Sequence, residues 1–478
     1  MPVPPSSSSI APIFAPVSPT ELLSFTVLCR PASGIGLDEF RIRLAACDTD
    51  ALLPRAKTLV AVAARLRELG FEVFDNLVFP DGRPGLAVFA RGPVELFERV
   101  FRTTLARMTW RSIDDEKPVR ELVSTGIVIA EDAAAPSLEP LGSDAILVSV
   151  AEPPMLAEPV ATTVETAAST ALCLTLSDVA HETHAHDVHQ RSLFFRGRAT
   201  GRGVRVAVVD TGFAMHPFFD AYHVTRIAGP YASGGGLGNE HGTQVLANLL
   251  VCAPGVDAWA VKYYSPDTAF ATAMFIPRVR VISLSWGFPI GSDPRPASVV
   301  PLEYFVQTAI NRGIAVVVAS GYRTGETTPA RLQGVIAVGG ARVESPSPPT
   351  AWGNSSAFTS TIYGTRLVPD LCGIASQINM PVPEPPTGWA CQWGSTSCAA
   401  PQVAAIAALL IQKNPMLSPQ RVRHKLVSFA TDIMSGSAYL GTPAGPGKDD
   451  ATGGGLVNAV ASWQHVIDAW WTLLWSWL

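Results

Sequence analysis

The chain is 478 residues long, 47% hydrophobic and 16% charged, with a formal net charge of −5. This length exceeds that of one average domain, so two or three compact units are expected. The net charge is small and Lys and Arg form no long cluster, so the sequence predicts no basic surface that would bind nucleic acid. No apolar run reaches the length needed to cross a bilayer, so we expect no transmembrane segment.

The N-terminal residues and the cysteines bear on where the protein is found. Residues 1–20 carry no charged side chain and are interrupted by Pro and Ser, whereas a secretory signal has a basic start and a continuous apolar core. The cysteines are odd in number and lack metal-ligand spacing, which favours free thiols in a reducing compartment. They are Cys29, Cys47, Cys173, Cys252, Cys372, Cys391 and Cys398. We therefore expect a cytoplasmic protein, with signal-independent export as the open alternative.

Residues 21–135 carry the pattern of one small domain, behind a disordered Pro/Ser-rich leader at residues 1–20. The predicted elements, in chain order, are a strand at Ser24–Cys29, a helix at Pro54–Leu69, strands at Glu72–Phe79 and Gly85–Ala90, a helix at Val94–Thr104 and a strand near Ile127–Ala130. This order is typical of an α+β ferredoxin-like domain. Residues 136–188, rich in Ala, Pro, Ser, Thr and Glu, indicate a linker with an isolated strand at Ile146–Val150.

From residue 189 to residue 460, short β-branched runs alternate with helical ones. The predicted strands are Val204–Val209, Ala258–Val261, Val279–Leu284, Ile314–Ala319 and Val335–Val338. Continuous apolar strands separated by helices predict an α/β domain with a doubly wound, mostly parallel sheet that is covered on both faces. In such a sheet, the functional groups lie beyond the carboxyl ends of the strands.

Three residues at the ends of predicted elements carry hydrolytic chemistry when taken together. Asp210 ends a strand, His241 begins an apolar helix and Ser397 stands just before another helix. Each alone also has a structural interpretation, such as a helix cap. As a set, they supply a serine hydroxyl, an imidazole that takes its proton and a carboxylate that orients the imidazole. A helix N-terminus beside Ser397 also aims backbone N–H groups at a developing oxyanion.

The sequences around these three residues resemble those of the subtilase family. The matching segments are Val206–Gly212 for the family's Asp block, His241–Thr243 for its His block and Thr396–Pro401 for its Ser block, in the family's order. Supporting segments that also match are Ile282–Gly287, Val335–Gly339 and Gly455–Asn458. The resemblance covers roughly residues 189–460 and implies a subtilisin-like fold for this domain.

The resemblance implies a serine endopeptidase that hydrolyses peptide bonds in protein or peptide substrates and needs neither a cofactor nor a metal. Asp210, His241 and Ser397 would be catalytic. Thr396, the backbone N–H of Ser397 and Tyr322 would hold the oxyanion. The residues implied to bind the substrate are Ser285, Trp286, Gly287, Ala319, Ser320 and Gly321.

Two positions depart from the family pattern. Ser395 stands where the Ser block usually has Gly, and Tyr322 stands where subtilases usually have an Asn that donates its amide to the oxyanion. The loss of one such donor lowers turnover strongly. A catalytically weak or inactive subtilase-fold protein that binds a peptide or a regulatory partner therefore stays open as an alternative.

The two flanking regions have both structural and functional interpretations. Residues 24–130, and Gly85–Phe101 in particular, resemble the propeptide domains of subtilases and sedolisins. This implies that the chain's own N-terminal domain inhibits the peptidase, with an unrelated accessory domain as the alternative. Residues 461–478 are Trp-rich and predict a C-terminal helix with a thin polar stripe. That helix either packs on the peptidase domain or docks on a partner or a membrane interface.

A group of histidines precedes the peptidase domain. Its members are His181, His184, His186 and His189. At helical spacing, three of them share one face, which fits either a metal site or a solvated helix face; no Cys or regular spacing supports the metal. Subtilases often bind calcium, but no acidic loop here has the spacing of calcium ligands.

Overall fold

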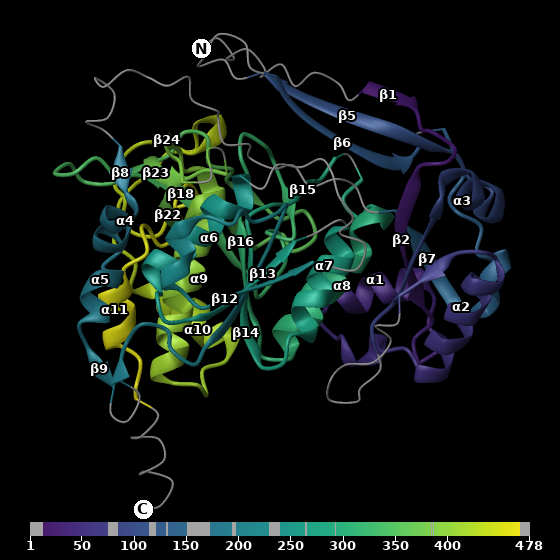
Figure 1. Cartoon of the computed structure of the whole chain (residues 1–478), viewed down its shortest axis with the longest axis horizontal. Coiled ribbons are helices and arrows are strands. Elements are labelled where there is room, and N and C mark those ends of the chain that lie inside the picture. Colours follow the sequence, from purple (N-terminus) through teal and green to yellow (C-terminus); the bar gives the residue numbers. More distant parts are fainter. Residues whose placement is uncertain are drawn as a thin grey trace, which may run out of the picture. The chain divides into compact units, whose positions relative to one another are not determined.

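The computed structural model describes the chain as two compact units, one formed mainly by residues up to Glu158 and the other mainly by residues from Pro159 onward (Figure 1). The residues it describes are 13–74, 85–113, 121–130, 132–150, 173–193, 197–228, 240–262, 265–291, 293–383, 385 and 387–468. Most of the predicted leader, the middle of the predicted linker and the last ten residues lie outside this described part.

The N-terminal unit contains a four-stranded antiparallel sheet in the order β3-β4-β2-β7. Its strands are β2 (Leu22–Cys29), β3 (Glu72–Val73), β4 (Val88–Pro93) and β7 (Ala145–Ser149), and its helices are α1 (Leu37–Ala45), α2 (Ala56–Glu68) and α3 (Val94–Phe101). Apart from α1, these elements follow the order β2-α2-β3-β4-α3-β7 along the chain. This is the connectivity of the predicted ferredoxin-like domain.

Aromatic side chains form much of the core of this unit. α3 places Val94, Phe97 and Phe101 on one face, and all three are buried. Phe25 of β2 packs edge-on against Phe71 and Phe97, with ring centroids 5.0 Å apart in both pairs. The amphipathic spacing in the sequence therefore determines which face of α3 covers the sheet.

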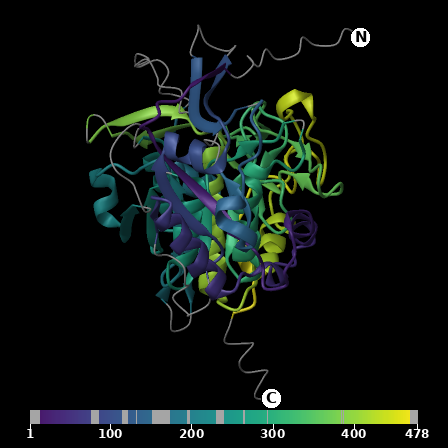
Figure 2. The same cartoon turned by 90° about the vertical axis from the view of Figure 1, so that its right-hand side faces the viewer.

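Two segments differ from their predicted places. The predicted strand near Ile127–Ala130 is the end of β6 (Glu121–Ile129), which pairs with β5 (Leu105–Ile113). β5 also pairs with β1 (Ile13–Pro16), so part of the predicted leader is a strand. The β5–β6 hairpin extends away from the four-stranded sheet in both views (Figure 1, Figure 2).

The fourth strand of the ferredoxin-like sheet is instead β7, which the sequence placed in a linker. Several short apolar runs compete for this position, and periodicity alone does not assign a strand to its partner.

The second unit is built around an eight-stranded sheet in the order β12-β13-β11-β14-β16-β18-β19, with β22 also paired to β18. Its strands are β11 (Arg205–Asp210), β12 (Val224–Ala228), β13 (Asp257–Lys262), β14 (Val279–Leu284), β16 (Ala315–Ala319), β18 (Ile336–Arg342), β19 (Thr350–Ala351) and β22 (Leu371–Ile374). All pairs are parallel except β18–β19. The predicted mostly parallel sheet is confirmed.

Helices cover both faces of this sheet. α6 (Glu240–Cys252) and α9 (Ser395–Lys413) pack together on one side, and α7 (Pro266–Phe275) and α8 (Val300–Asn311) lie on the other (Figure 1). Among the described residues, α9 is the one helix long and apolar enough to cross a membrane, contrary to the expectation that no stretch reaches this length. Because 94% of that stretch is buried inside the protein, its apolar character is that of a core helix.

The end of the predicted linker belongs to the second unit. β8 (Leu174–Thr175) leads into α4 (Leu176–Glu182) through a capping box formed by Thr175 and Asp178. α5 (Ala185–His189) follows, and the core of the unit contains apolar residues from both helices. The linker prediction was wrong here because polar residues dominate the sequence of these short helices.

The histidines of this segment make structural contacts. His189 Nε2 lies 2.9 Å from the carbonyl oxygen of Cys252, and burial lowers the pKa of His189. The rings of His181 and His186 pack with their centroids 4.1 Å apart, and His184 Nδ1 lies 3.1 Å from Asp187. In the part of the chain that the structure describes, no three His, Cys, Asp or Glu side chains are grouped to hold a metal ion.

One disulfide corrects the expectation of free thiols. Cys173 is bonded to Cys391 across 218 positions of sequence, while Cys29, Cys252, Cys372 and Cys398 are buried thiols and Cys47 is partly exposed. The two cysteines meet because β8 pairs with β23 (Gln377–Pro381), which pairs in turn with β24 (Trp389–Trp393). Disulfides are typical of oxidising compartments, so the argument from free thiols no longer supports a cytoplasmic location. The location itself stays a prediction.

The predicted C-terminal helix begins earlier than expected, and within the described residues it ends at Gln464. α11 spans Ala459–Gln464, and residues 465–468 are not helical. Trp463 is buried, and the ammonium group of Lys413 lies 3.6 Å from the centre of its ring. This tryptophan therefore packs on the peptidase unit, whereas docking by the residues after 468 stays a prediction.

The remaining elements of the second unit are short or lie at its edges. They are β9 (Ser192–Leu193), β10 (Gly197–Arg198), β15 (Phe288–Pro289), β17 (Thr327–Thr328), β20 (Phe358–Thr359), β21 (Leu367–Val368) and α10 (Pro419–Ser428).

Candidate active site

Asp210 and His241 form a buried carboxylate–imidazole pair. Asp210 is the last residue of β11 and has no exposed surface, and His241 lies in the first turn of α6 with 7% of its surface exposed. The Nδ1 atom of His241 lies 2.7 Å from Oδ1 of Asp210. A carboxylate at Nδ1 favours the tautomer that carries its proton there, which leaves Nε2 as a proton acceptor.

The loop after β11 orients this carboxylate. The backbone N–H and the hydroxyl of Thr211 both donate to Oδ1 of Asp210, at 2.7 and 3.2 Å. The hydroxyl of Thr243 accepts a hydrogen bond of 2.8 Å from the backbone N–H of Ala214. The loop that follows Asp210 is therefore tied to the first turn of the helix that carries His241.

Gly242 permits the close approach of α6 to β11. A Cβ atom at this position would lie 2.2 Å from the carbonyl oxygen of Gly212 and 3.1 Å from Cβ of Asp210. The first of these distances is too short for real atoms, so any side chain would push the helix away from the strand. The His-Gly-Thr segment thus has a local physical reason: its glycine lets His241 reach Asp210.

Ser397 lies in the first turn of α9 and has 3% of its surface exposed. Its Oγ donates to the carbonyl oxygen of Ser285 at 3.0 Å, and the Ser285 hydroxyl donates back to the carbonyl oxygen of Ser397 at 2.7 Å. Ser285 directly follows β14, which pairs with β11. These reciprocal bonds hold the start of α9 at the sheet edge that carries Asp210. There, Nε2 of His241 is buried and has no hydrogen-bond partner among the described residues.

All three groups predicted to hold the oxyanion make other contacts. The Thr396 hydroxyl donates to the carbonyl oxygen of Gly321 at 3.2 Å. The ring of Tyr322 packs against Trp352, with centroids 5.6 Å apart, and its backbone bridges to Ser355. The backbone N–H of Ser397 donates to the hydroxyl of Ser395 at 3.2 Å.

The residues predicted to bind the substrate lie at the carboxyl ends of the neighbouring parallel strands β14 and β16. Ser285, Trp286, Ala319 and Ser320 are buried. The Trp286 indole N–H donates to the carbonyl oxygen of Val209 at 2.8 Å, so this side chain supports β11. Gly287 and Gly321 are partly exposed, so the predicted substrate contacts would be made by the backbone.

A buried amide pair that the sequence interpretation missed links α6 and α9, the helices that carry His241 and Ser397. The amide nitrogen of Gln402 on α9 donates to the side-chain oxygen of Asn248 on α6 at 3.0 Å, and both residues are fully buried. Gln402 also accepts from the backbone N–H of Ile374 at 2.8 Å. An amide inside the apolar part of each helix was the available signal, because buried amides are retained where they are hydrogen-bonded.

Cys398, the neighbour of Ser397, is not a competing nucleophile. Burial raises the pKa of its thiol well above the usual range, and the charge of Asp210 adds to this effect. Its Sγ lies 3.6 Å from Sδ of Met380 in the core. The thiol therefore stays protonated and packs as an apolar group.

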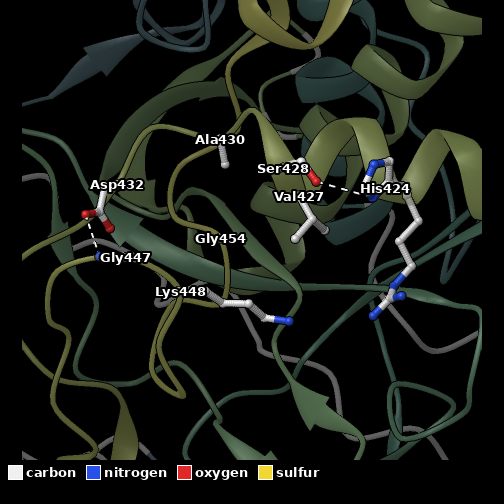
Figure 3. A pocket seen from close by; sticks show the side chains of 9 residues that line it. His424, Val427, Ser428, Ala430, Asp432, Gly447, Lys448 and Gly454 are labelled. Atoms are coloured by element: carbon white, nitrogen blue, oxygen red, sulfur yellow. Dashed lines mark hydrogen bonds between the residues drawn. The ribbon is translucent and has the colours of Figure 1, made fainter. Parts of the chain in front are cut away.

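A pocket of about 620 Å³ lies at the end of α10 (Figure 3). Two pairs of its lining residues are hydrogen-bonded: Ser428 lies 3.3 Å from His424, and Asp432 accepts from the backbone N–H of Gly447 at 2.8 Å. It contains none of the predicted catalytic residues.

A buried Asp–His pair and a serine at a helix N-terminus, at the carboxyl edge of one parallel sheet, are features shared by serine hydrolases of the Asp-His-Ser type. Residues 201–455 match the model of the subtilase family. Subtilisin BL from Lederbergia lenta is 32% identical over 282 residues, which cover 55% of this chain and 91% of that protein. Subtilisin E from Bacillus subtilis is 29% identical over 293 residues, which cover 55% of this chain and 67% of that protein.

The chain belongs to the subtilase family, and the matched stretch contains Asp210, His241 and Ser397. It is a serine endopeptidase with a subtilisin-like fold. Among solved structures, fervidolysin from Fervidobacterium pennivorans, a keratinolytic enzyme related to subtilisin, is 17% identical with a TM-score of 0.55. That likeness, which concerns the fold alone, covers 93% of this chain and 61% of the other.

Proposed function

We propose that Ser397 is the nucleophile of this endopeptidase, that His241 is its general base and that Asp210 orients His241. The observation that carries the proposal is the 2.7 Å contact between His241 Nδ1 and Asp210 Oδ1, at the sheet edge that also holds Ser397. Treatment of the full-length protein with a fluorophosphonate tests it, since only an activated serine reacts. Labelling that maps to a residue other than Ser397 would contradict the assignment.

The reaction follows from these three residues. The Ser397 hydroxyl turns from the carbonyl of Ser285 toward Nε2 of His241, passes its proton to that nitrogen and attacks the peptide carbonyl carbon. The charge of Asp210 stabilises the imidazolium that forms. His241 then gives the proton to the departing amine, which leaves an acyl group on Ser397. A water molecule, deprotonated by His241, hydrolyses this ester and restores the serine.

Tyr322 provides a test of how well the oxyanion is held. An Asn amide lies close to its backbone, whereas a Tyr hydroxyl lies farther out along a rigid ring, here packed against Trp352. We therefore propose that Tyr322 is a poor oxyanion donor. Tyr322→Asn should raise kcat by up to about 10²-fold with little change in KM, because the oxyanion exists only in the transition state and the intermediate. Steady-state kinetics on a peptide substrate checks this.

Tyr322→Phe is the matched control, since it removes the hydroxyl and keeps the ring. We expect its kcat to stay near that of the wild type. A marked loss of kcat in Tyr322→Phe, or an unchanged kcat in Tyr322→Asn, would identify the tyrosine as a working donor or as a wall of the substrate site.

We also propose that the N-terminal unit inhibits the peptidase as a propeptide does. The ferredoxin-like order of its elements supports this proposal, as does its lying outside the stretch matched to the subtilase family. A fragment of residues 13–150, added in trans to the peptidase unit, should lower its rate of peptide hydrolysis in a saturable way. A fragment that is folded by circular dichroism and yet neither binds nor inhibits would refute the proposal.

A further inference from the structure

The backbone N–H of Ser397 is already hydrogen-bonded in the free protein. It donates to Oγ of Ser395 at 3.2 Å, and both residues are buried. This N–H is also the donor assigned above to the oxyanion. An oxygen that accepts from it therefore stands where the anionic oxygen of a tetrahedral intermediate would bind.

The contacts of the other expected oxyanion donors, Thr396 and Tyr322, make the N–H of Ser397 more important. Thr396 donates its hydroxyl proton to the carbonyl oxygen of Gly321. At the next position that subtilases use, this chain has Tyr322, whose ring packs against Trp352, in place of an amide. The N–H of Ser397 thus carries a larger share of oxyanion stabilisation, and its occupation by Ser395 matters correspondingly more.

The backbone at Ser395 shows that the turn itself does not require this side chain. Ser395 has a φ of +43°, in the left-handed region that glycine adopts freely and other residues adopt at a cost. The Ser block of subtilases usually has Gly here, so the turn forms without a hydroxyl. The serine therefore adds an acceptor beside the N–H of Ser397 at a position that disfavours any side chain.

We propose that the Ser395 hydroxyl occupies the oxyanion site of the free enzyme and must rotate away before acyl transfer, so that it limits kcat. The inference rests on the proposed role of Ser397 as nucleophile. No bond is made or broken at Ser395, whose hydroxyl only changes its partner. Its displacement opposes the transition state in particular, because the developing oxyanion is the group that has to replace it.

The alternative role for the same hydroxyl would be to assist catalysis. After rotation, it would donate its proton to the oxyanion and stand in for the missing Asn amide. In that case, removal of the hydroxyl would lower kcat. The buried hydroxyl is seen accepting from the N–H of Ser397, which favours occupation of the site over donation to it.

Ser395→Ala in the full-length protein separates these roles, since it removes the hydroxyl and keeps a Cβ. We expect kcat for a peptide substrate to rise about two- to tenfold, with little change in KM, because one hydrogen bond is no longer lost in each turnover. A peptidyl trifluoromethyl ketone, whose adduct with serine carries an oxyanion, should bind more tightly by a similar factor. Binding of the product peptide should not change. A merely structural role of Ser395 would not produce this difference between the ketone and the product.

Ser395→Gly serves as the second variant, because it also relieves the left-handed backbone. It should match Ser395→Ala in kcat. An unchanged or lower kcat in both variants, measured on folded protein, would overturn the proposal. If neither the wild type nor Ser395→Ala is labelled by a fluorophosphonate, the proposed nucleophile role fails and the inference fails with it. The two failures are therefore distinguishable.

Discussion

Ser397→Ala is expected to abolish fluorophosphonate labelling and to lower kcat for peptide hydrolysis by about 10⁶-fold. The substitution removes the attacking oxygen, and the neighbouring Cys398 thiol does not replace it, because that thiol stays protonated in the core. Folding should be retained, since the Ser397 hydroxyl makes one hydrogen bond, to the carbonyl oxygen of Ser285, in the described structure. Steady-state kinetics, with circular dichroism for the fold, provides the measurement.

The matched control is Ser395→Ala, two positions earlier in the same helix turn. It also deletes one buried hydroxyl, yet it should keep labelling and turn over faster rather than more slowly. If Ser397→Ala is still labelled, or if Ser395→Ala alone loses all labelling, the register of the serine block is wrong and Ser395 is the nucleophile.

Asp210→Asn should lower kcat by about 10⁴-fold while leaving KM and the fold nearly unchanged. Oδ1 of Asp210 accepts from His241 and from both donors of Thr211. An amide of the same shape preserves at most the accepting oxygen. It carries no charge to stabilise the imidazolium, and if the amide is flipped it donates to Nδ1 and moves the histidine proton to Nε2, where the base has to be free. Single-turnover acylation measures the step concerned.

Asp220→Asn is the control for this change, because it removes a carboxylate that is exposed at the surface of the same unit. It should leave kcat within about twofold of the wild type, since surface substitutions away from a site have small effects. Equal losses in Asp210→Asn and Asp220→Asn would point to a general electrostatic effect. A fully active Asp210→Asn would remove Asp210 from the proposed mechanism.

The peptidase sheet and the three proposed catalytic residues could be predicted because their signals are local. Each strand of the sheet is a contiguous β-branched run, and such runs alternate with helices in a way that few folds other than parallel α/β sheets accommodate. Asp210 is the last residue of its strand, and Ser397 lies in the first turn of its helix. In a parallel sheet, the carboxyl ends of adjacent strands lie at the same edge. The order of the strands along the chain was therefore enough to predict that Asp210 and the predicted substrate-binding residues after β14 and β16 lie at one edge.

Other features were decided by tertiary structure, because they depend on which distant segments meet. The periodicity of β6 and β7 is alike, and only pairing with β2 made β7 the fourth strand of its sheet. Likewise, Cys173 and Cys391 are separated by 218 positions, and the β8–β23–β24 sheet brings their Cα atoms to 6.1 Å.

The contact between Ser395 and Ser397 is another feature that the sequence indicated only in part and the tertiary structure decided. The sequence by itself determined that Ser395 departs from the glycine usual at this position, but not that its hydroxyl would lie against the N–H of Ser397. That outcome depends on the left-handed φ of Ser395 and on a side-chain rotamer chosen in a buried turn. Rotamers are selected by the surrounding packing, which only the folded chain provides.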